Sequence, residues 1–484
     1  MERLRSWLPE ALAAGVAGVA GSYALAGFTQ AFVAGSLAST VARVTPGIVV
    51  TAAITTLGDA GKLLTVAGGF AVAVALFATI ALAARAAGDA VESTALPPML
   101  AGTAAFGAST LLTGALAPAL AAGAAVGATL VVVPLAARVG GDAPDPGRRR
   151  VLGAVGTALA AAGVAYPLGR RRTPGAVADD PPSDPEVRSL LAEASAKSLD
   201  VDGLEPLVSD EFYEVDINAA DPTLDADEWT LSVTGAVDED LELDYDEVTA
   251  MESREVFTTL RCVGESLNGR KMDTALWTAV PLRDVLERAG VGENCCVMLR
   301  AADGYYEEFP VAALREGMLA YRMNGDPLPR GHGYPVRALI PGHWGEINVK
   351  WLTEIEILAE PADGYWEKRG WHGTGPVNTV AKLHATARDG DRIEVAGHAY
   401  AGTRGISAVE VSTDGGDTWQ EATLSEELPG KDVWRQWAYA YDSPGERHEV
   451  VVRAIEADGT VQPKERADAY PSGPTGWVSK ELRG

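Results

Sequence analysis

The first third of the chain consists of long uncharged runs of Ala, Gly, Val and Leu. These runs extend over about residues 11–42, 63–84, 93–137 and 151–169. A helix needs about 20 apolar residues to cross a bilayer, so the run 93–137 has room for two helices joined near Pro118. The pattern predicts a transmembrane helical domain over residues 1–172 with five or six helices. Small residues such as Gly123 and Gly127 would let these helices pack closely.

The segment 46–87 has two interpretations. Its stretch Gly58-Asp-Ala-Gly-Lys62 is either a turn between two helices or part of one long helix. The predicted number of helices depends on this segment.

The pattern changes after residue 172. Residues 173–205 are rich in Pro, Asp and Ser and then weakly helical, which predicts a linker. Beyond the linker, Trp229–Gly235 alternates as a strand does, and Leu282–Ala289 has the pattern of a short helix that stops at Gly290. Strands and short helices mix without a βαβ rhythm, so we expect an α+β domain over residues 206–375.

Residues 376–484 contain only strand and turn patterns. The clearest strands begin at Arg392, Ala408 and Glu449, and Asp414-Gly-Gly is a turn. About seven short strands in about 100 residues predict an immunoglobulin-like β-sandwich.

Charge divides the chain at the same place. Residues 1–172 hold 12 Lys/Arg and 7 Asp/Glu, whereas the rest of the chain holds 28 and 59. So acidic a segment repels phosphates, which excludes nucleic acid as a partner. Trp, Tyr and Val recur in it at strand spacing, so it is folded rather than disordered. Dense carboxylate on a folded surface is typical of a halophile, because net charge maintains solubility in brine.

The chain has three cysteines, too few for a disulfide framework. Cys295 and Cys296 lie in an apolar strand-like run and are predicted to be core residues. Cys262 follows a β-branched strand and lies beside Arg261. A thiolate in this position suits a soft metal or a nucleophile with a lowered pKa, and the alternative is a buried free cysteine that acts as a small hydrophobe.

Several long motifs support the metal hypothesis. Cys262-Val-Gly is followed in order by the motifs Ala275–Leu286, Met323–Arg337 and Val349–Leu352. Together they resemble the sulfite oxidase-fold family of molybdenum enzymes over about residues 205–475. The resemblance implies an oxidoreductase with one molybdopterin, in which the Cys262 thiolate binds molybdenum and an oxygen atom is transferred in a two-electron step.

The resemblance also implies roles for other residues. The predicted cofactor contacts are Arg261, Cys262, Trp277, His332, Arg337 and Lys350. The predicted catalytic residues are Cys262, Tyr305 and Arg435. An arginine suits the pterin phosphate because its guanidinium forms bidentate charge-assisted bonds. The ordinary alternatives are core packing for Trp277, a half-buried strand position for Tyr305 and an exposed strand arginine for Arg435. For His332, Arg337 and Lys350 the alternative is a solvated surface group.

The chain departs from the family where sulfite oxidases concentrate positive charge. Arginines expected after the cysteine are replaced by Ser266 and Leu267. Val215, Ile217 and Ile347 likewise stand where the family has Arg, His and Arg. A pocket for a small dianion needs converging positive charge, so sulfite is expected to be a poor substrate.

The first histidine of the chain is His332, so haem held by two histidines of the membrane domain is excluded. Electrons must therefore be exchanged with a separate carrier, such as a copper protein, a cytochrome or a quinone-linked partner. The other expected partners are membrane lipid and a small-molecule substrate. Residues 376–484 resemble the dimerisation domain of the family, which implies a homodimer.

Arginines flank the last apolar run, as Arg148-Arg-Arg before it and Arg170-Arg-Arg after it. Both clusters cannot remain in the cytoplasm, as arginines beside a span usually do. The first cluster is similar to an internal twin-arginine export signal. Export of a folded, cofactor-loaded domain favours a multi-pass protein of the cell membrane with an extracytoplasmic catalytic domain.

The sequence therefore predicts a membrane-anchored molybdenum-pterin oxidoreductase. Two alternatives within the same fold are a sulfoxide-type reductase and a sulfite dehydrogenase. An alternative of another class is an anchored binding domain that has no cofactor.

Overall fold

The computed structural model describes residues 2–57, 59–139, 146–171 and 182–483. The chain divides into two compact units, Met1–Ala176 with Ile217–Thr223, and Val177–Asp216 with Leu224–Gly484. Each unit is described separately below.

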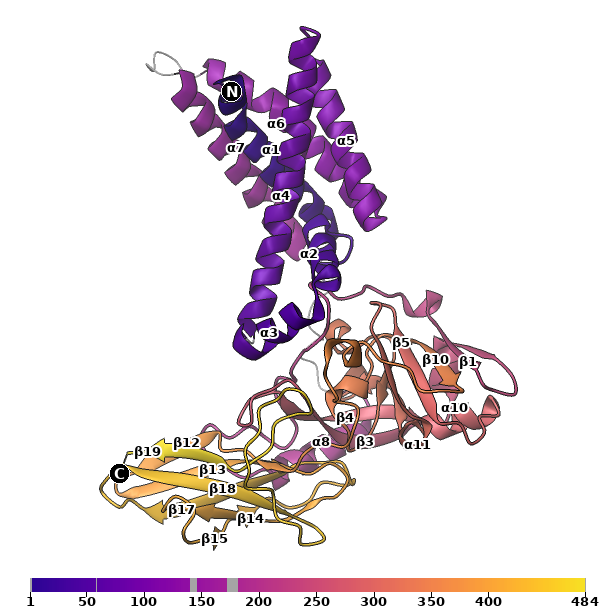
Figure 1. The fold of residues 1–484 in the computed structure, drawn as a ribbon, viewed down its shortest axis with the longest axis vertical. Coiled ribbons are helices and arrows are strands. Elements are labelled where there is room, and N and C mark those ends of the chain that lie inside the picture. The colour runs from indigo at the N-terminus through magenta and orange to yellow at the C-terminus, as the bar shows by residue number, and fades with distance from the viewer. Residues whose placement is uncertain (1, 58, 140–145, 172–181, 484) are drawn as a thin grey trace. The chain divides into compact units, whose positions relative to one another are not determined.

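Apart from Ile217–Thr223 and the connecting turns, the described residues of the first unit are helical (Figure 1). Its helices are α1 (Glu2–Ala26), α2 (Val33–Val44), α3 (Gly47–Leu57), α4 (Asp59–Ala90), α5 (Leu96–Thr113), α6 (Leu116–Val139) and α7 (Pro146–Arg170). Four segments are long and apolar enough to cross a membrane by length and composition: Ser6–Ala26, Ala60–Ala90, Leu116–Ala136 and Arg148–Arg170. The prediction of five or six transmembrane helices stays a prediction, because α5 and the shorter helices are outside this set.

The structure resolves the two uncertain helix boundaries. The segment 46–87 forms two helices, α3 and α4. The run 93–137 is divided at Gly114, whose φ of 68° ends α5, and not at Pro118. Pro118 lies in the first turn of α6, where a missing backbone N–H leaves no helical bond unmade.

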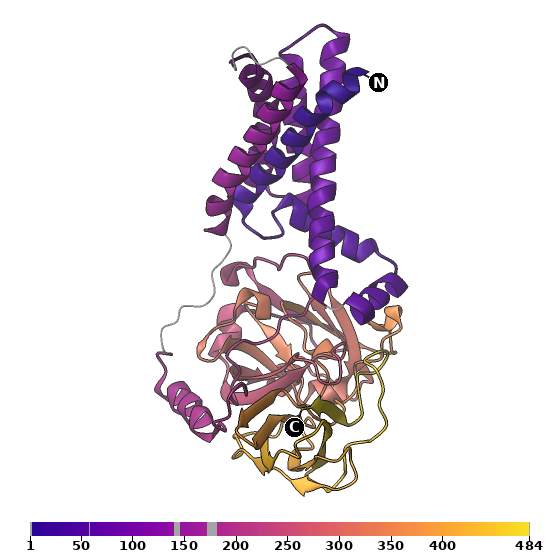
Figure 2. The same ribbon diagram turned by 90° about the vertical axis from the view of Figure 1, so that its left-hand side faces the viewer.

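The helices of the first unit pack against one another (Figure 2), and small residues and one ion pair join them. A Cβ at Gly123 would lie 2.5 Å from the Gly102 carbonyl oxygen, so α5 and α6 approach closely only because residue 123 is glycine. Arg85 of α4 pairs with Glu10 of α1 and donates to the Leu130 carbonyl of α6 at 2.7 Å. The segment Ile217–Thr223 packs on these helices, where the Ala219 N–H donates to Ser39 Oγ at 3.2 Å.

The second unit begins with α8 (Pro185–Lys197) and continues as an α+β domain with two sheets (Figure 1). One sheet has the order β2-β1-β10-β5-β6, and the other has the order β3-β4-β7-β8, with β9 beside β7. The strands are β1 (Thr230–Gly235), β2 (Leu241–Asp244), β3 (Arg254–Arg261), β4 (Met272–Pro281), β5 (Cys296–Ala301), β6 (Tyr306–Pro310), β7 (Met318–Met323), β8 (Asp326–Pro327), β9 (Arg337–Leu339) and β10 (Leu352–Leu358). The short helices are α9 (Tyr245–Ala250), α10 (Leu282–Arg288) and α11 (Val311–Leu314). The predicted strand at 229–235 and the predicted helix at 282–289 are both present.

From Val380 onward the described residues form strands and turns only. The strands are β11 (Val380–Ala381), β12 (Ala385–Asp389), β13 (Arg392–Tyr400), β14 (Ile406–Ser412), β15 (Gln420–Glu421), β16 (Thr423–Leu424), β17 (Arg435–Asp442), β18 (His448–Glu456) and β19 (Val478–Leu482). They form two sheets, β11-β13-β17-β16 with β12 beside β13, and β15-β14-β18-β19.

One prediction about the cysteines is wrong. Cys295 and Cys296 form a disulfide between adjacent residues, and Cys295 is exposed while Cys296 is buried. Side chains alternate across a strand, so two successive cysteines at a strand end cannot both point into the core.

Candidate active site

Cys262 lies at the first position of the loop between β3 and β4. The antiparallel register pairs Arg261 with Met272, so residues 262–271 form this loop. The Cys262 N–H donates to the Lys271 carbonyl at 2.9 Å, and the thiol is free and half-buried. Burial and the negative charge of Glu265 raise the pKa of Cys262 to about 11. A thiolate here needs a strong cation, and metal coordination deprotonates a thiol outright.

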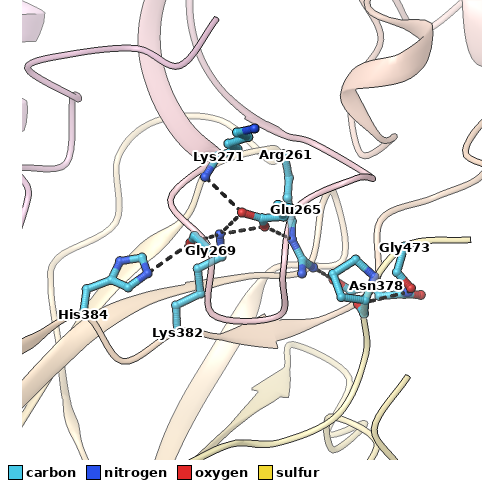
Figure 3. Close-up of polar contacts among 9 residues, drawn as sticks. Arg261, Glu265, Gly269, Lys271, Asn378, Lys382, His384 and Gly473 are labelled. Carbon is cyan, nitrogen blue, oxygen red and sulfur yellow. Dashed lines mark hydrogen bonds and ion pairs between the residues drawn. The ribbon is translucent and has the colours of Figure 1, made fainter. Parts of the chain in front are cut away.

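A buried charge network fastens this loop to the segment that follows β11 (Figure 3). Glu265 accepts from Arg261 Nε at 2.9 Å and from Lys382 Nζ at 2.7 and 2.8 Å. It also accepts from the Lys271 N–H at 3.0 Å, and Lys382 donates to the Gly269 carbonyl at 2.8 Å. The side chains of Arg261 and Lys382 are fully buried. Burial lowers the pKa of Lys382 to about 8 despite the attraction of Glu265.

Arg261 was predicted to contact the cofactor, and the structure places it in this network. Its Nη1 donates to the Asn378 carbonyl at 2.7 Å, and its guanidinium lies 4.8 Å from the centre of the Trp344 ring. Its Nη2 is buried and has no hydrogen-bond partner among the described residues. A direct contact with a cofactor stays a prediction for Arg261.

Three of the predicted cofactor contacts lie together. A Cβ on Gly333 would lie 3.0 Å from Lys350 Cβ and 3.1 Å from Arg337 Cβ. His332 is one residue before Gly333, and burial and Arg337 lower its pKa to about 3, so its imidazole is neutral. Lys350 Nζ donates to the Gly331 carbonyl at 2.8 Å.

Arg337 is a buried cation without a counterion. Its Nη1 and Nη2 donate to the carbonyls of His332 and Asn348 at 3.1 and 3.0 Å, and its Nε has no partner. In the part of the chain that the structure describes, no carboxylate pairs with it. Burial lowers its pKa to about 10, so the guanidinium is charged at neutral pH. An uncompensated buried guanidinium fits an anionic group such as the phosphate of a pterin.

Both interpretations of Trp277 find support in the geometry. Its side chain is fully buried in a cluster with Leu260 and Met323, which is core packing. Its ring also lies 5.3 Å from the Arg337 guanidinium and 5.6 Å from the Phe212 ring. Trp277 therefore supports Arg337 from the core side.

Tyr305 and Arg435 have different surroundings. The Tyr305 hydroxyl lies 3.0 Å from Glu307 Oε2 and 2.9 Å from the Glu346 carbonyl oxygen, and can donate to either. Arg435 in β17 pairs with Glu427 at 2.7 Å and donates to the Ser425 carbonyl. The residue before it, Trp434, donates its N–H to Thr259 Oγ1 of β3 at 2.9 Å, and a catalytic role for Arg435 stays a prediction.

Sequence reasoning missed Tyr213. A Cβ on Gly345 would lie 2.9 Å from Tyr213 Oη and 3.3 Å from the Arg261 carbonyl oxygen, which places this hydroxyl beside the Cys262 strand. Burial and then Cys262 raise its pKa well above the usual value. The signal was available, because Tyr213 lies in the same motif as the substituted position Val215.

Sequence comparisons agree with the motifs. Residues 218–366 match the family described as the oxidoreductase molybdopterin binding domain, and residues 376–470 match the Mo-co oxidoreductase dimerisation domain. The chain is 32% identical over 297 residues to mitochondrial sulfite oxidase of Rattus norvegicus, and 31% identical to that of Homo sapiens, covering 50% of this chain and 54% of each relative. It is 27% identical over 284 residues to the NADH nitrate reductase of Spinacia oleracea, covering 46% of this chain and 31% of the reductase.

The chain therefore spans about half the length of the sulfite oxidases that it matches. Among solved structures, the sulfane dehydrogenase SoxCD from Paracoccus pantotrophus matches with a TM-score of 0.49 and 19% identity, over 64% of this chain and 94% of that one. From the two domain matches and the sulfite oxidase relatives together, residues 218–470 belong to the sulfite oxidase-like family of molybdopterin-dependent oxidoreductases.

Proposed function

We propose that this protein is a membrane-anchored enzyme that transfers an oxygen atom to or from a small neutral or singly charged substrate, with molybdenum held by Cys262 and one molybdopterin. When bound, this group would give an oxygen atom to the substrate while taking up two electrons, or would take an oxygen atom from it while giving two electrons. The main support for the proposal is that the free thiol of Cys262, at the first position of a loop, lies in the same domain as Arg337, a buried arginine without a counterion.

The residues of the chain have separable tasks in this proposal. Arg337 holds the anionic end of the pterin, and Lys350, whose side chain begins beside it and pairs with Asp216 at 3.4 Å, supports the same end. His332 is neutral and can donate or accept one hydrogen bond to the pterin ring. The network of Arg261, Glu265 and Lys382 orients the loop that carries Cys262.

The substrate class is inferred from the charges of the side chains around the proposed site. Ser266 is exposed, and Leu267 and Ile347 are buried apolar residues, so none of these positions offers a cation. Glu346 lies near enough to Cys262 to contribute to the raised pKa of the thiol, so it would repel an anion whenever it is ionised. Binding of a dianion should therefore be weak, and a neutral sulfoxide-type substrate is favoured over sulfite. Sulfite oxidation by the same fold is the second candidate, which the similarity to sulfite oxidases supports.

The proposal extends to the rest of the chain. Four helices with the length and composition of membrane spans support an anchor in the cell membrane. We place the catalytic domain outside the cytoplasm, where a separate carrier exchanges the electrons. The match of residues 376–470 to a dimerisation domain supports a homodimer, and its two sheets are compatible with an immunoglobulin-like sandwich.

Metal and pterin analysis of the purified full-length protein tests the proposal. We expect one molybdenum and one pterin per chain, and turnover of a neutral sulfoxide or of sulfite with a redox dye. Protein that folds but contains neither molybdenum nor pterin would instead be an anchored binding domain. A sulfite KM in the micromolar range would leave the enzyme class intact but overturn the argument from charge.

A further inference from the structure

A second group of side chains that can bind a ligand lies outside the residues assigned above. Glu307 of β6, Glu346 of the 3-10 turn Gly345–Ile347 and Glu367 of the 3-10 turn Glu367–Arg369 come from three separate parts of the domain. One carboxylate oxygen from each lies within 4.8 Å of the others. Glu307 is fully buried, Glu346 is 8% exposed and Glu367 is half-buried.

The carboxylates of Glu346 and Glu367 are not compensated. All four of their oxygens are buried without a hydrogen-bond partner in the described part of the chain. No lysine, arginine or histidine of the described residues forms an ion pair with any of the three glutamates. Glu346 is an independent indication of a ligand, because an unpartnered carboxylate that is more than nine-tenths buried costs several kcal/mol unless something pairs with it.

The same domain shows how it compensates a buried carboxylate when no ligand is involved. Glu265 is also buried, and it is paired with both Arg261 and Lys382. The three glutamates have no such partner, although their surroundings orient them. Glu307 accepts from the Tyr305 hydroxyl at 3.0 Å and from the Trp366 N–H at 3.3 Å.

Two glycines make room for the carboxylates. A Cβ at Gly364 would lie 1.3 Å from Glu307 Oε1 and 2.6 Å from Glu367 Oε2. A Cβ at Gly373 would lie 1.9 Å from Glu346 Oε2. Any larger residue at these positions would displace the carboxylates from one another.

We propose that Glu307, Glu346 and Glu367 form a binding site for a divalent cation of the calcium, magnesium or manganese type. All the side-chain donors are carboxylate oxygens, which such hard cations prefer to the sulfur and nitrogen ligands selected by softer metals. Water and nearby carbonyls complete the coordination. None of the three residues was assigned to molybdenum or to the pterin, but the site borders the proposed active site, because Tyr305 contacts Glu307 and Glu346 lies near Cys262.

Protons compete with the cation for this site. Burial and the neighbouring carboxylates raise the pKa of Glu307, and burial and Glu367 raise the pKa of Glu346 to about 8. Cation binding must displace these protons, so affinity should increase as the pH rises.

Binding of Mn²⁺ to detergent-solubilised full-length protein, followed by the loss of the free-ion signal in electron paramagnetic resonance, tests the site. At about pH 8.5 we expect one saturable site, and weaker binding at about pH 6. Glu346→Gln should lower the Mn²⁺ affinity by at least about tenfold, because even a substitution that only disturbs the support of a metal ligand typically lowers metal affinity by about that much. Unlabelled Ca²⁺ or Mg²⁺ should compete.

The matched control is Glu308→Gln, which removes one carboxylate from the next position of β6 and from the opposite face of the strand. It should leave Mn²⁺ affinity unchanged. If Glu346→Gln does not fold, Glu367→Gln provides the same test at a half-buried position. The proposal is overturned if no saturable site appears up to about 10 mM Mn²⁺, a concentration well above the Kd of weak extracellular calcium sites. It is also overturned if Glu308→Gln weakens Mn²⁺ binding as much as Glu346→Gln does. Molybdenum content measured in parallel reports separately on the proposed function.

Discussion

Replacement of Lys382 by methionine should destabilise the catalytic domain and loosen the loop that carries Cys262. The side chain of Lys382 is fully buried, and its ammonium group contacts both oxygens of Glu265 and the Gly269 carbonyl. Methionine has a similar length but no donor. The substitution therefore removes three polar contacts at once and leaves the buried carboxylate with Arg261 and the Lys271 N–H as its remaining partners.

The size of the effect follows from which charges remain. Removal of one partner from a buried ion pair costs about 3–5 kcal/mol, because the other charge stays buried. Arg261 keeps one contact with Glu265 at 2.9 Å, so we expect the lower end of that range, about 3 kcal/mol. Glu265→Gln should also destabilise the domain, because it leaves Arg261 and Lys382 buried as like charges. The double variant should lose less stability than the sum of the two single variants, with a coupling energy of about 2 kcal/mol.

Chemical denaturation followed by tryptophan fluorescence measures these effects in the full-length protein. All 11 tryptophans except Trp7 lie beyond residue 223, so the signal comes from the second unit. Lys480→Met is the matched control, because Lys480 makes an exposed hydrogen bond of 3.1 Å to Thr386, and it should change stability by less than about 0.5 kcal/mol. The reasoning would be refuted if the stability losses of the two single variants added up to that of the double variant. It would also be refuted if Lys382→Met were as stable as the Lys480→Met control.

Three further predictions concern the site and its surroundings. Cys262→Ser should lose molybdenum or retain an inactive metal, because a hydroxyl is a poor replacement for a soft thiolate, and full turnover by this variant would contradict the assignment. Arg337→Ala should lower pterin occupancy more than turnover per bound molybdenum, since a charge-assisted bond contributes about 1.5–3 kcal/mol, and unchanged pterin content would show that this arginine does not hold the cofactor. Burial, and to a smaller extent His384, lower the pKa of His398 to about 3. The folded protein therefore keeps this histidine neutral, and its stabilising contribution is complete above about pH 6.5. As the pH falls below that value, the contribution decreases by about 1.4 kcal/mol per pH unit. His398→Gln retains a donor for the Glu205 carbonyl, 3.0 Å from the histidine Nε2, and its stability should depend less steeply on pH between about 6.5 and 4; a slope equal to that of the original protein would refute this.

Local pattern was sufficient for much of the fold. The strand at Thr230–Gly235 and the helix at Leu282–Arg288 lie where alternation and a terminal Gly290 predict them. The boundary between the two helices in the run 93–137 was predicted at the wrong residue. Pro118 is compatible with a first helical turn, whereas Gly114 has a positive φ of 68° that ends a helix.

Contacts over long sequence distances could not be predicted in the same way. Lys382 is 117 residues from Glu265, and nothing local to either residue indicates the other. The cluster of His332, Arg337 and Lys350 was predicted, because all three lie within motifs of a known family. Arg435 also matched a family motif, but the motif did not indicate the ion pair that Arg435 forms with Glu427.

The compensation of buried charge connects the two sites proposed for this domain. The Arg261–Glu265–Lys382 network shows that this fold can neutralise a buried carboxylate with its own side chains. Arg337 is a buried cation without a carboxylate, and Glu346 is a buried carboxylate without a cation. A buried guanidinium without a partner destabilises the domain by several kcal/mol, whereas burial raises the pKa of Glu346 to about 8 and keeps its carboxyl protonated at neutral pH unless a cation pairs with it. A phosphate-bearing pterin at Arg337 and a divalent cation at Glu346 meet both requirements.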